Sequence, residues 1–266
     1  MGIAAETTSF SATNPGATFT AVTMATGDTN RVRTFNPTTP AKLIEATRQG
    51  VSAGSLRIAS PALHDNVRGI NLIAGQTPSV FPLPREIGQP LVSGDTLTIS
   101  LTGGTGEVDG GTITIFYQDL AGIQARLHGW ADISGYIEHI KPLEIDVTGS
   151  GTAMAWSDTV ITTTEDLLNA DRSYAVLGYS TDTAAAAVGL KGQEIGNLHL
   201  AGCGTLLSED TNDYFIDWAE NYGLPIIPVI SANNKGSIFA SLAMVATSQS
   251  VKLQLILARL STQFAG

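Results

Sequence analysis

Apolar and polar residues alternate with a period of two in several short segments rich in Thr, Ile, Leu and Val. The clearest are 95–101 (DTLTISL), 112–117 (TITIFY), 143–147 (LEIDV) and 251–258 (VKLQLILA). Successive side chains of a strand point to opposite faces of a sheet, so this period predicts strands with one buried face. Gly-, Asn- and Asp-rich clusters such as 103–111 and 231–236 suit turns with positive φ and predict hairpin loops. The chain is therefore expected to be mainly β.

Two stretches depart from this period and predict short helices. They are 43–49 (LIEATRQ) and 167–173 (LLNADRS), each with apolar residues on one side. The residues expected to cap, open or end them are Thr38 or Thr39, Pro40 and Gly50 for the first, and Thr163 or Thr164, Glu165 and Asp166 for the second.

The two predicted helices resemble each other, and further matches follow in the same order along the chain. Leu43 matches Leu167 at a spacing of 124 residues, with Ala46 on Ala170. The later matches are LIAG (72–75) with HLAG (199–202), GQPLV (88–92) with GLPII (223–227), and TITIFYQDL (112–120) with KLQLILARL (252–260). The spacing grows from 124 to 140 residues, as it does when the second copy of a duplicated fold gains loop residues.

The many short strands, in two copies of about 130 residues each, predict one β-sandwich per copy. We expect an all-β protein of two tandem jelly-roll β-sandwiches, each with one or two short helices. The expected boundaries are an N-terminal arm at 1–16, a first jelly roll at 17–128 and a second at 129–266, with 121–142 as the connecting segment. An immunoglobulin-like sandwich is the nearest alternative, but it is usually about 100 residues long and needs no helix.

Composition and charge limit the kinds of molecule that the protein is expected to contact. Charged residues make up 14% of the chain and hydrophobic residues 43%, so much of the surface is expected to meet protein. The net charge is −10, and the first 30 residues hold no Lys or Arg, which disfavours direct nucleic-acid binding. No apolar run is long enough to span a membrane and no signal peptide is recognised, so synthesis in a host cytoplasm is expected. The single Cys203 excludes an internal disulfide.

Candidate catalytic chemistry is sparse. Ser52 lies in GVSAG, which matches the G-x-S-x-G nucleophile motif, but a predicted helix precedes it and a strand follows, the reverse of the required order. The histidines show no metal-ligand spacing, although His64 adjoins Asp65; they are His64, His128, His139 and His199. GGTGEVDGG (103–111) fails the phosphate-loop spacing. We therefore expect no catalytic, cofactor-binding or metal-binding residues.

Two binding alternatives stay open. The acidic loop SEDTND (208–213) has enough oxygen atoms for calcium but lacks EF-hand spacing. Six aromatic residues could form a sugar-binding platform, although core or interface anchoring is the simpler interpretation. They are Trp130, Trp156, Trp218, Tyr136, Tyr214 and Tyr222.

Two consecutive jelly-roll-like copies with low charge, no active site and a tethered N-terminal arm resemble the double jelly-roll major capsid proteins of tailless icosahedral double-stranded DNA viruses. The resemblance implies a homotrimer with a pseudo-hexagonal outline that tiles the virion shell, with possible contacts to penton proteins, minor capsid proteins and an internal membrane. The resemblance assigns no catalytic or binding residue to this chain. A phage tail, fibre or adhesin component, or a carbohydrate-binding or hydrolytic β-protein, are the alternatives.

Overall fold

The structure is a computed structural model, and it describes residues 2–24, 40–61, 65–75, 79–82, 89–91, 95–118, 122–162, 168–204 and 211–264. Within these ranges the chain forms two β-sandwiches in succession. This confirms the expected fold class of an all-β protein made of two tandem jelly rolls.

The first sandwich pairs two antiparallel sheets. One has the order β3-β1-β10-β4-β7 with β8 beside β4, and the other has the order β2-β9-β5-β6. The bounds of these strands are β1 Ala4–Thr13, β2 Thr20–Ala21, β3 Thr23–Met24, β4 Ala41–Gln49, β5 Gly54–Ser60, β6 Asp65–Ala74, β7 Ser79–Pro82, β8 Gln89–Leu91, β9 Thr98–Thr102 and β10 Val108–Tyr117.

The second sandwich has sheets of order β11-β17-β14-β19-β12 and β13-β18-β15-β16. Its strands are β11 Leu127–His128, β12 Ile137–Thr148, β13 Ser157–Val160, β14 Ser173–Thr181, β15 Ala185–Gly192, β16 His199–Gly204, β17 Ile227–Ser231, β18 Ile238–Ala243 and β19 Ser250–Leu260. Two α-helices, α1 Trp130–Ile133 and α2 Tyr214–Tyr222, lie near one end, and short 3-10 helices span Ser134–Tyr136, Gln193–Ile195 and Ala232–Ser237.

Both sandwiches have the same strand order. In each, the first long strand pairs with the last, the last with the third, and the third with the sixth, as in β1-β10-β4-β7 and β12-β19-β14-β17. The other sheet joins the second, seventh, fourth and fifth strands, as in β2-β9-β5-β6 and β13-β18-β15-β16. This is the jelly-roll arrangement in both copies.

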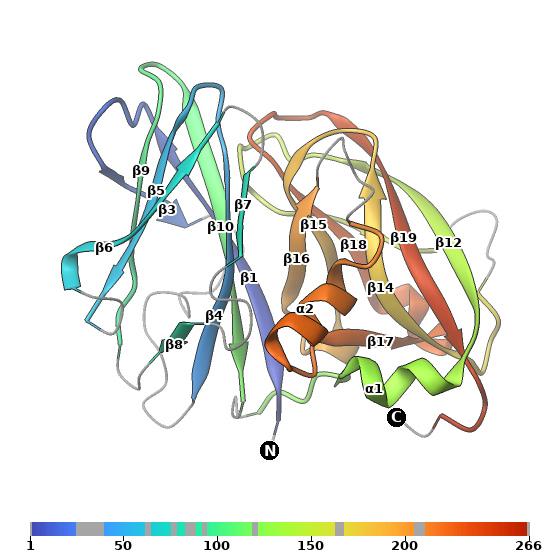
Figure 1. The fold of residues 1–266 in the computed structure, drawn as a ribbon. Helices are drawn as coiled ribbons and strands as arrows, with labels where there is room; N and C mark the ends of the chain where they lie inside the picture. The colour runs from blue at the N-terminus through green and yellow to red at the C-terminus, as the bar shows by residue number, and fades with distance from the viewer. Residues whose placement is uncertain are drawn as a thin grey trace.

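The four sheets stack as four layers (Figure 1). The β2-β9-β5-β6 sheet is outermost at one end, followed by the β1-β10-β4 sheet, the β13-β18-β15-β16 sheet, and the β14-β19-β12 sheet at the other end. The contact between the two jelly rolls joins β1 to β16 and β4 and β10 to β15. The sheet of β1, β10 and β4 is consequently buried on both faces.

The helix predicted at 43–49 is wrong, because these residues form β4. A β-bulge in the pairing of β10 with β4 places Thr114 opposite Glu45 and Ile115 opposite Leu43, which leaves Ile44 as the extra residue. Leu43 and Ala46 therefore join the core of the first jelly roll, whereas Ile44 joins the core cluster of the second. The resulting apolar spacing imitates that of a helix.

The second predicted helix, at 167–173, is also wrong over the residues that the structure describes. Thr163–Leu167 lie outside the described residues, as do Thr38 and Thr39. The chain turns at Ala170 and Asp171 and enters β14 at Ser173. Asp171 has a positive φ of 62°, a value that no α-helix uses.

The repeat alignment is right in the later strands and wrong at Leu43. The pairs 72–75 with 199–202 and 112–117 with 252–257 fall on equivalent strands of the two copies. Ile115 pairs with Leu43, and its predicted counterpart Leu255 pairs with Tyr179. The counterpart of Leu43 is therefore Tyr179 rather than Leu167.

The predicted N-terminal arm at 1–16 is also wrong. Ala4–Thr13 form β1, which pairs with β10 through ten consecutive residue pairs and is buried along most of its length. Its inward side chains include Ala4 and Phe10 in the first core, whereas Thr7 and Ser9 face the second jelly roll. Small and hydroxyl-bearing residues on a strand buried on both faces give no period-two signal, so the sequence pattern does not reveal this strand.

Candidate functional site: the interface between the two jelly rolls

The interface between the jelly rolls is built on small residues. Ala186, Ala187, Ala201 and Ala243 form a buried cluster with Met154 on the second jelly roll. On the facing strand β10, a Cβ at Gly110 would lie 2.1 Å from Met154 Cγ, so only glycine fits there. The small side chains allow the two sheets to approach closely.

Hydroxyl groups of the first jelly roll bond the backbone of the second. Thr7 Oγ1 donates to the carbonyl of Ala201 (2.9 Å) and accepts from its N–H (3.0 Å). Thr47 Oγ1 donates to the carbonyl of Ala186 (3.0 Å), and Ser9 Oγ to that of Met154 (2.8 Å). Buried polar groups cost free energy unless they are bonded, so these pairs select one register between the two sheets.

Helix α2 adds a second set of contacts through one of its faces. Tyr214, Trp218 and Tyr222 are spaced four residues apart and therefore lie on the same side of the helix. Tyr214 Oη donates to Glu45 Oε1, Trp218 Nε1 donates to Glu45 Oε2 (3.0 Å), and Tyr222 Oη donates to the carbonyl of Ile44 (2.8 Å). The helix of one jelly roll is thus bound to β4 of the other.

Glu45 is fully buried in this contact, and its hydrogen-bond donors are neutral. Burial raises the pKa of Glu45 to about 7, and the hydrogen bonds from Tyr214 and Trp218 only partly oppose that effect. Tyr179 and Cys203 also lie near enough to interact with its charge. The carboxyl group is therefore protonated in mildly acidic solution and changes charge near neutrality.

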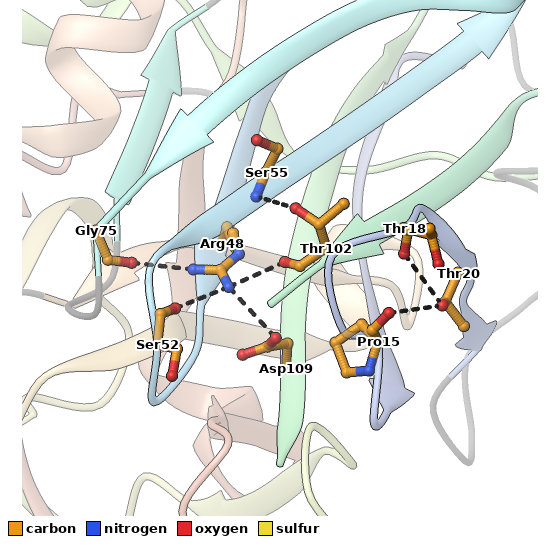
Figure 2. A network of polar contacts seen from close by, with 9 residues as sticks. All are labelled: Pro15, Thr18, Thr20, Arg48, Ser52, Ser55, Gly75, Thr102 and Asp109. Carbon is orange, nitrogen blue, oxygen red and sulfur yellow. Dashed lines mark hydrogen bonds and ion pairs between the residues drawn. The ribbon is translucent and has the colours of Figure 1, made fainter. Parts of the chain in front are cut away.

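A buried ion pair explains the glycines of the GVSAG motif (Figure 2). Arg48 Nη2 lies 3.3 Å from Asp109 Oδ2, and both side chains have no exposed surface. The Arg48 guanidinium also donates to three carbonyls, those of Ser52 (3.0 Å), Gly75 (2.9 Å) and Thr102 (3.2 Å). A Cβ at Gly50 would lie 1.9 Å from Asp109 Oδ1.

This arrangement gives Ser52 a structural role. Ser52 lies in the turn between β4 and β5, and its backbone carbonyl, not its hydroxyl, is what Arg48 binds. A Cβ at Gly54 would lie 2.1 Å from the carbonyl oxygen of Thr102. The motif therefore makes room for a buried arginine and joins two strands, instead of opening a helix as a nucleophile elbow does.

A polar row that sequence reasoning missed crosses the four strands of the β13-β18-β15-β16 sheet. Asp158 Oδ1 accepts from Ser241 Oγ (2.7 Å) and lies 3.1 Å from His199 Nε2, and Asp158 Oδ2 accepts from Lys191 Nζ (2.9 Å). Hydrogen bonds from these partners hold the pKa of Asp158 well below its usual range, against the effect of burial. The Trp156 and His199 rings stack with centroids 4.1 Å apart.

The row does not have the geometry of a catalytic triad. Ser241 donates to the carboxylate that His199 also contacts, whereas a nucleophilic serine must donate to the imidazole. The four residues lie on four different strands and are far apart in the sequence. Only the jelly-roll pairing brings them together.

Of the other predicted candidates, those that lie among the described residues are not brought together. His64 lies outside the described residues, His139 is exposed on β12, and the ring of His128 packs edge-on against Phe264 at 5.2 Å. Burial lowers the pKa of His128. Cys203 is buried, and burial raises the pKa of its thiol well above the usual range, which leaves it unreactive.

The acidic loop 208–213 can be followed only from Thr211, because 208–210 lie outside the described residues. In the part of the chain that the structure describes, no group of three or more His, Cys, Asp or Glu side chains could hold a metal ion. No helix in the same part is long and apolar enough to cross a membrane.

The six aromatic residues do not form a common platform. Tyr214, Trp218 and Tyr222 are buried at the interface described above. Trp156 stacks on His199, and Tyr136 packs edge-on against Phe264. Trp130 lines a hollow of about 490 Å³ between α1 and α2, together with Asp132, Glu220, Leu224 and Pro225.

No protein-family model matches the chain, and no curated protein matches it. Among solved structures, the chain is similar to a chain in the atomic structure of Sulfolobus Turreted Icosahedral Virus, with 10% sequence identity over 98% of this chain and 91% of that chain, and a TM-score of 0.22.

Proposed function

We propose that this chain is a structural virion protein, the major capsid protein of an icosahedral shell, and that it assembles as a homotrimer with a pseudo-hexagonal outline. The observation that carries the proposal is the stacking of two jelly rolls of identical strand order, joined by buried hydrogen bonds. Three such chains present six similar modules at about 60° intervals, which allows a threefold unit to occupy a hexagonal lattice.

The chemistry of the buried groups supports a structural role. The buried polar groups Thr7, Thr47 and Glu45 bond protein groups of the other jelly roll and so serve to join the two jelly rolls. Within the first jelly roll, the Arg48–Asp109 pair joins the ends of several strands. On this proposal the partners are further copies of the chain, with penton proteins, minor capsid proteins or an internal membrane as additional contacts.

Native mass spectrometry and electron microscopy of the purified protein test the proposal. We expect trimers with six lobes in projection, and shells or hexagonal arrays at high protein concentration. A monomer, or a ring with an even number of subunits, would rule the proposal out.

The hydrolase alternative is tested separately. We expect no turnover on a panel of ester and glycoside substrates, because Ser241 donates to a carboxylate and the turn that holds Ser52 joins two strands instead of opening a helix. Turnover that disappears in Ser241→Ala or His199→Ala would contradict the structural interpretation.

A further inference from the structure

The two outermost layers of the molecule carry exposed apolar side chains on opposite ends of the stack. Ile73 on β6 is 82% exposed, and Ile140 on β12 is 48% exposed. Ile73 belongs to the β2-β9-β5-β6 sheet of the first jelly roll and Ile140 to the sheet of β14, β19 and β12 in the second (Figure 1). Each residue therefore marks the outer face of one end layer.

The two end faces belong to the same two types of sheet, by strand order, that already pack against each other inside the molecule. Within the chain, the β1-β10-β4 sheet of the first jelly roll packs on the β15-containing sheet of the second. By strand order, the β19-containing sheet is the counterpart of the β1-β10-β4 sheet, and the β5-containing sheet is the counterpart of the β15-containing sheet. A contact between the two end faces of neighbouring copies would repeat the internal contact.

The two jelly rolls also differ in charge. Residues 1–128 contain 8 basic and 9 acidic residues, whereas residues 129–266 contain 6 basic and 15 acidic ones. Among the described residues of the first jelly roll, four acidic side chains are buried, namely Glu6, Glu45, Asp95 and Asp109, and so is the basic side chain of Arg48. The net charge is therefore −1 for residues 1–128 (8 − 9) and −9 for residues 129–266 (6 − 15).

The charge difference extends to the end faces themselves. On the first, the Arg57 guanidinium lies 4.2 Å above the Phe19 ring and its Nε donates to Ser100 Oγ (3.2 Å), which holds the cation in place. On the second, three carboxylates surround Lys252: Glu144 accepts from its Nζ (2.9 Å), Asp182 accepts from its backbone N–H (2.9 Å), and Asp146 is its cross-strand partner. One ammonium group leaves two of these three negative charges uncompensated.

We propose that the outer face of the β2-β9-β5-β6 sheet, with Arg57 and Ile73, docks on the outer face of the β14-β19-β12 sheet of a second copy, with Ile140 and the carboxylates around Lys252. This inference rests on the proposed trimer and assigns its contact. The contact is heterologous, joining unlike faces, and a heterologous contact closes into a ring when its rotation divides a full turn. Arginine suits it because its planar guanidinium can pair with two carboxylate oxygens.

Charge reversal tests the assignment. Arg57→Glu and Asp146→Lys should each raise the dissociation constant of the trimer by about tenfold or more, and the double variant should restore much of the affinity, since opposite charges again face each other. Ile73→Asp, on a side chain that is largely exposed, should weaken the trimer without lowering the melting temperature of the monomer. Glu220→Lys, an exposed acidic residue on α2, is the matched control and should leave the trimer unchanged.

The outcomes separate this inference from the proposed function. A monomeric wild-type protein would overturn both. A trimeric wild-type protein whose affinity is unchanged in Arg57→Glu, Asp146→Lys and Ile73→Asp would overturn the face assignment alone, as would an equal effect of Glu220→Lys. If Arg57→Glu fails to fold because the Phe19 contact is lost, Asp146→Lys and Ile73→Asp still decide the question.

Discussion

At the scale of the residue, Glu45 links the stability of the molecule to pH. The folded state raises its pKa from 4.5 to about 7, so between these values the folded protein keeps a proton that the unfolded chain releases. The unfolded state is therefore favoured progressively as the pH rises through this window. We expect the free energy of unfolding to fall by roughly 3 kcal/mol from pH 4.5 to 7 on account of Glu45.

Urea unfolding of the wild-type protein and of Glu45→Gln between pH 4 and 8 measures this effect. The amide can accept from Trp218 and donate to Tyr214, so the variant should fold and should lack the Glu45 contribution to the pH dependence. Parallel curves for the two proteins across this range would show that folding does not shift the pKa of Glu45.

The buried Arg48–Asp109 pair gives a second prediction at the same scale. Arg48→Met leaves Asp109 without its partner and three carbonyls without their donor, and should lower the free energy of unfolding by about 3–5 kcal/mol. Ser52→Ala is the matched control, because Arg48 binds only the backbone of that residue, and should change it by less than about 0.5 kcal/mol. Chemical denaturation measures both, and a similar cost for the two variants would refute the role assigned to Arg48.

At the scale of the element, β1 decides whether the first jelly roll forms. It pairs with both β3 and β10 and supplies Phe10 to the first core. Deleting residues 2–13 should therefore abolish the cooperative unfolding of the first jelly roll. If these residues were only an arm, their deletion would weaken assembly and leave the fold intact. Calorimetry and circular dichroism distinguish these results, and an unchanged melting transition after the deletion would contradict the placement of β1.

At the scale of the whole molecule, the two jelly rolls depend on each other. Isolating the second jelly roll as residues 122–266 would expose its alanine-rich face and leave Tyr214 and Trp218 without Glu45. We expect the isolated fragment to self-associate and to melt at a lower temperature than the full chain. Light scattering and thermal denaturation test this, and a monomeric fragment with the melting temperature of the full chain would show that the interface contributes nothing.

The sequence by itself determined the mainly β character, the jelly-roll class and the matches between β6 and β16 and between β10 and β19. Strands such as β12 and β19 have one buried face, and alternation reports that state directly. The sequence also shows the low charge and the excess of acidic residues in the second half, where 15 of the 24 lie.

Only the tertiary structure decided the features that depend on contacts between distant segments. β1 and β4 are buried on both faces by the second jelly roll, which removes the alternation, and the bulge at Ile44 adds a false helical spacing. The pKa of Glu45 depends on a helix that lies about 170 residues further along the chain, since Tyr214 and Trp218 are separated from it by 169 and 173 residues. Local patterns report how a segment meets its own sheet, whereas the stacking of one sheet on another sets which groups are buried and what they bind.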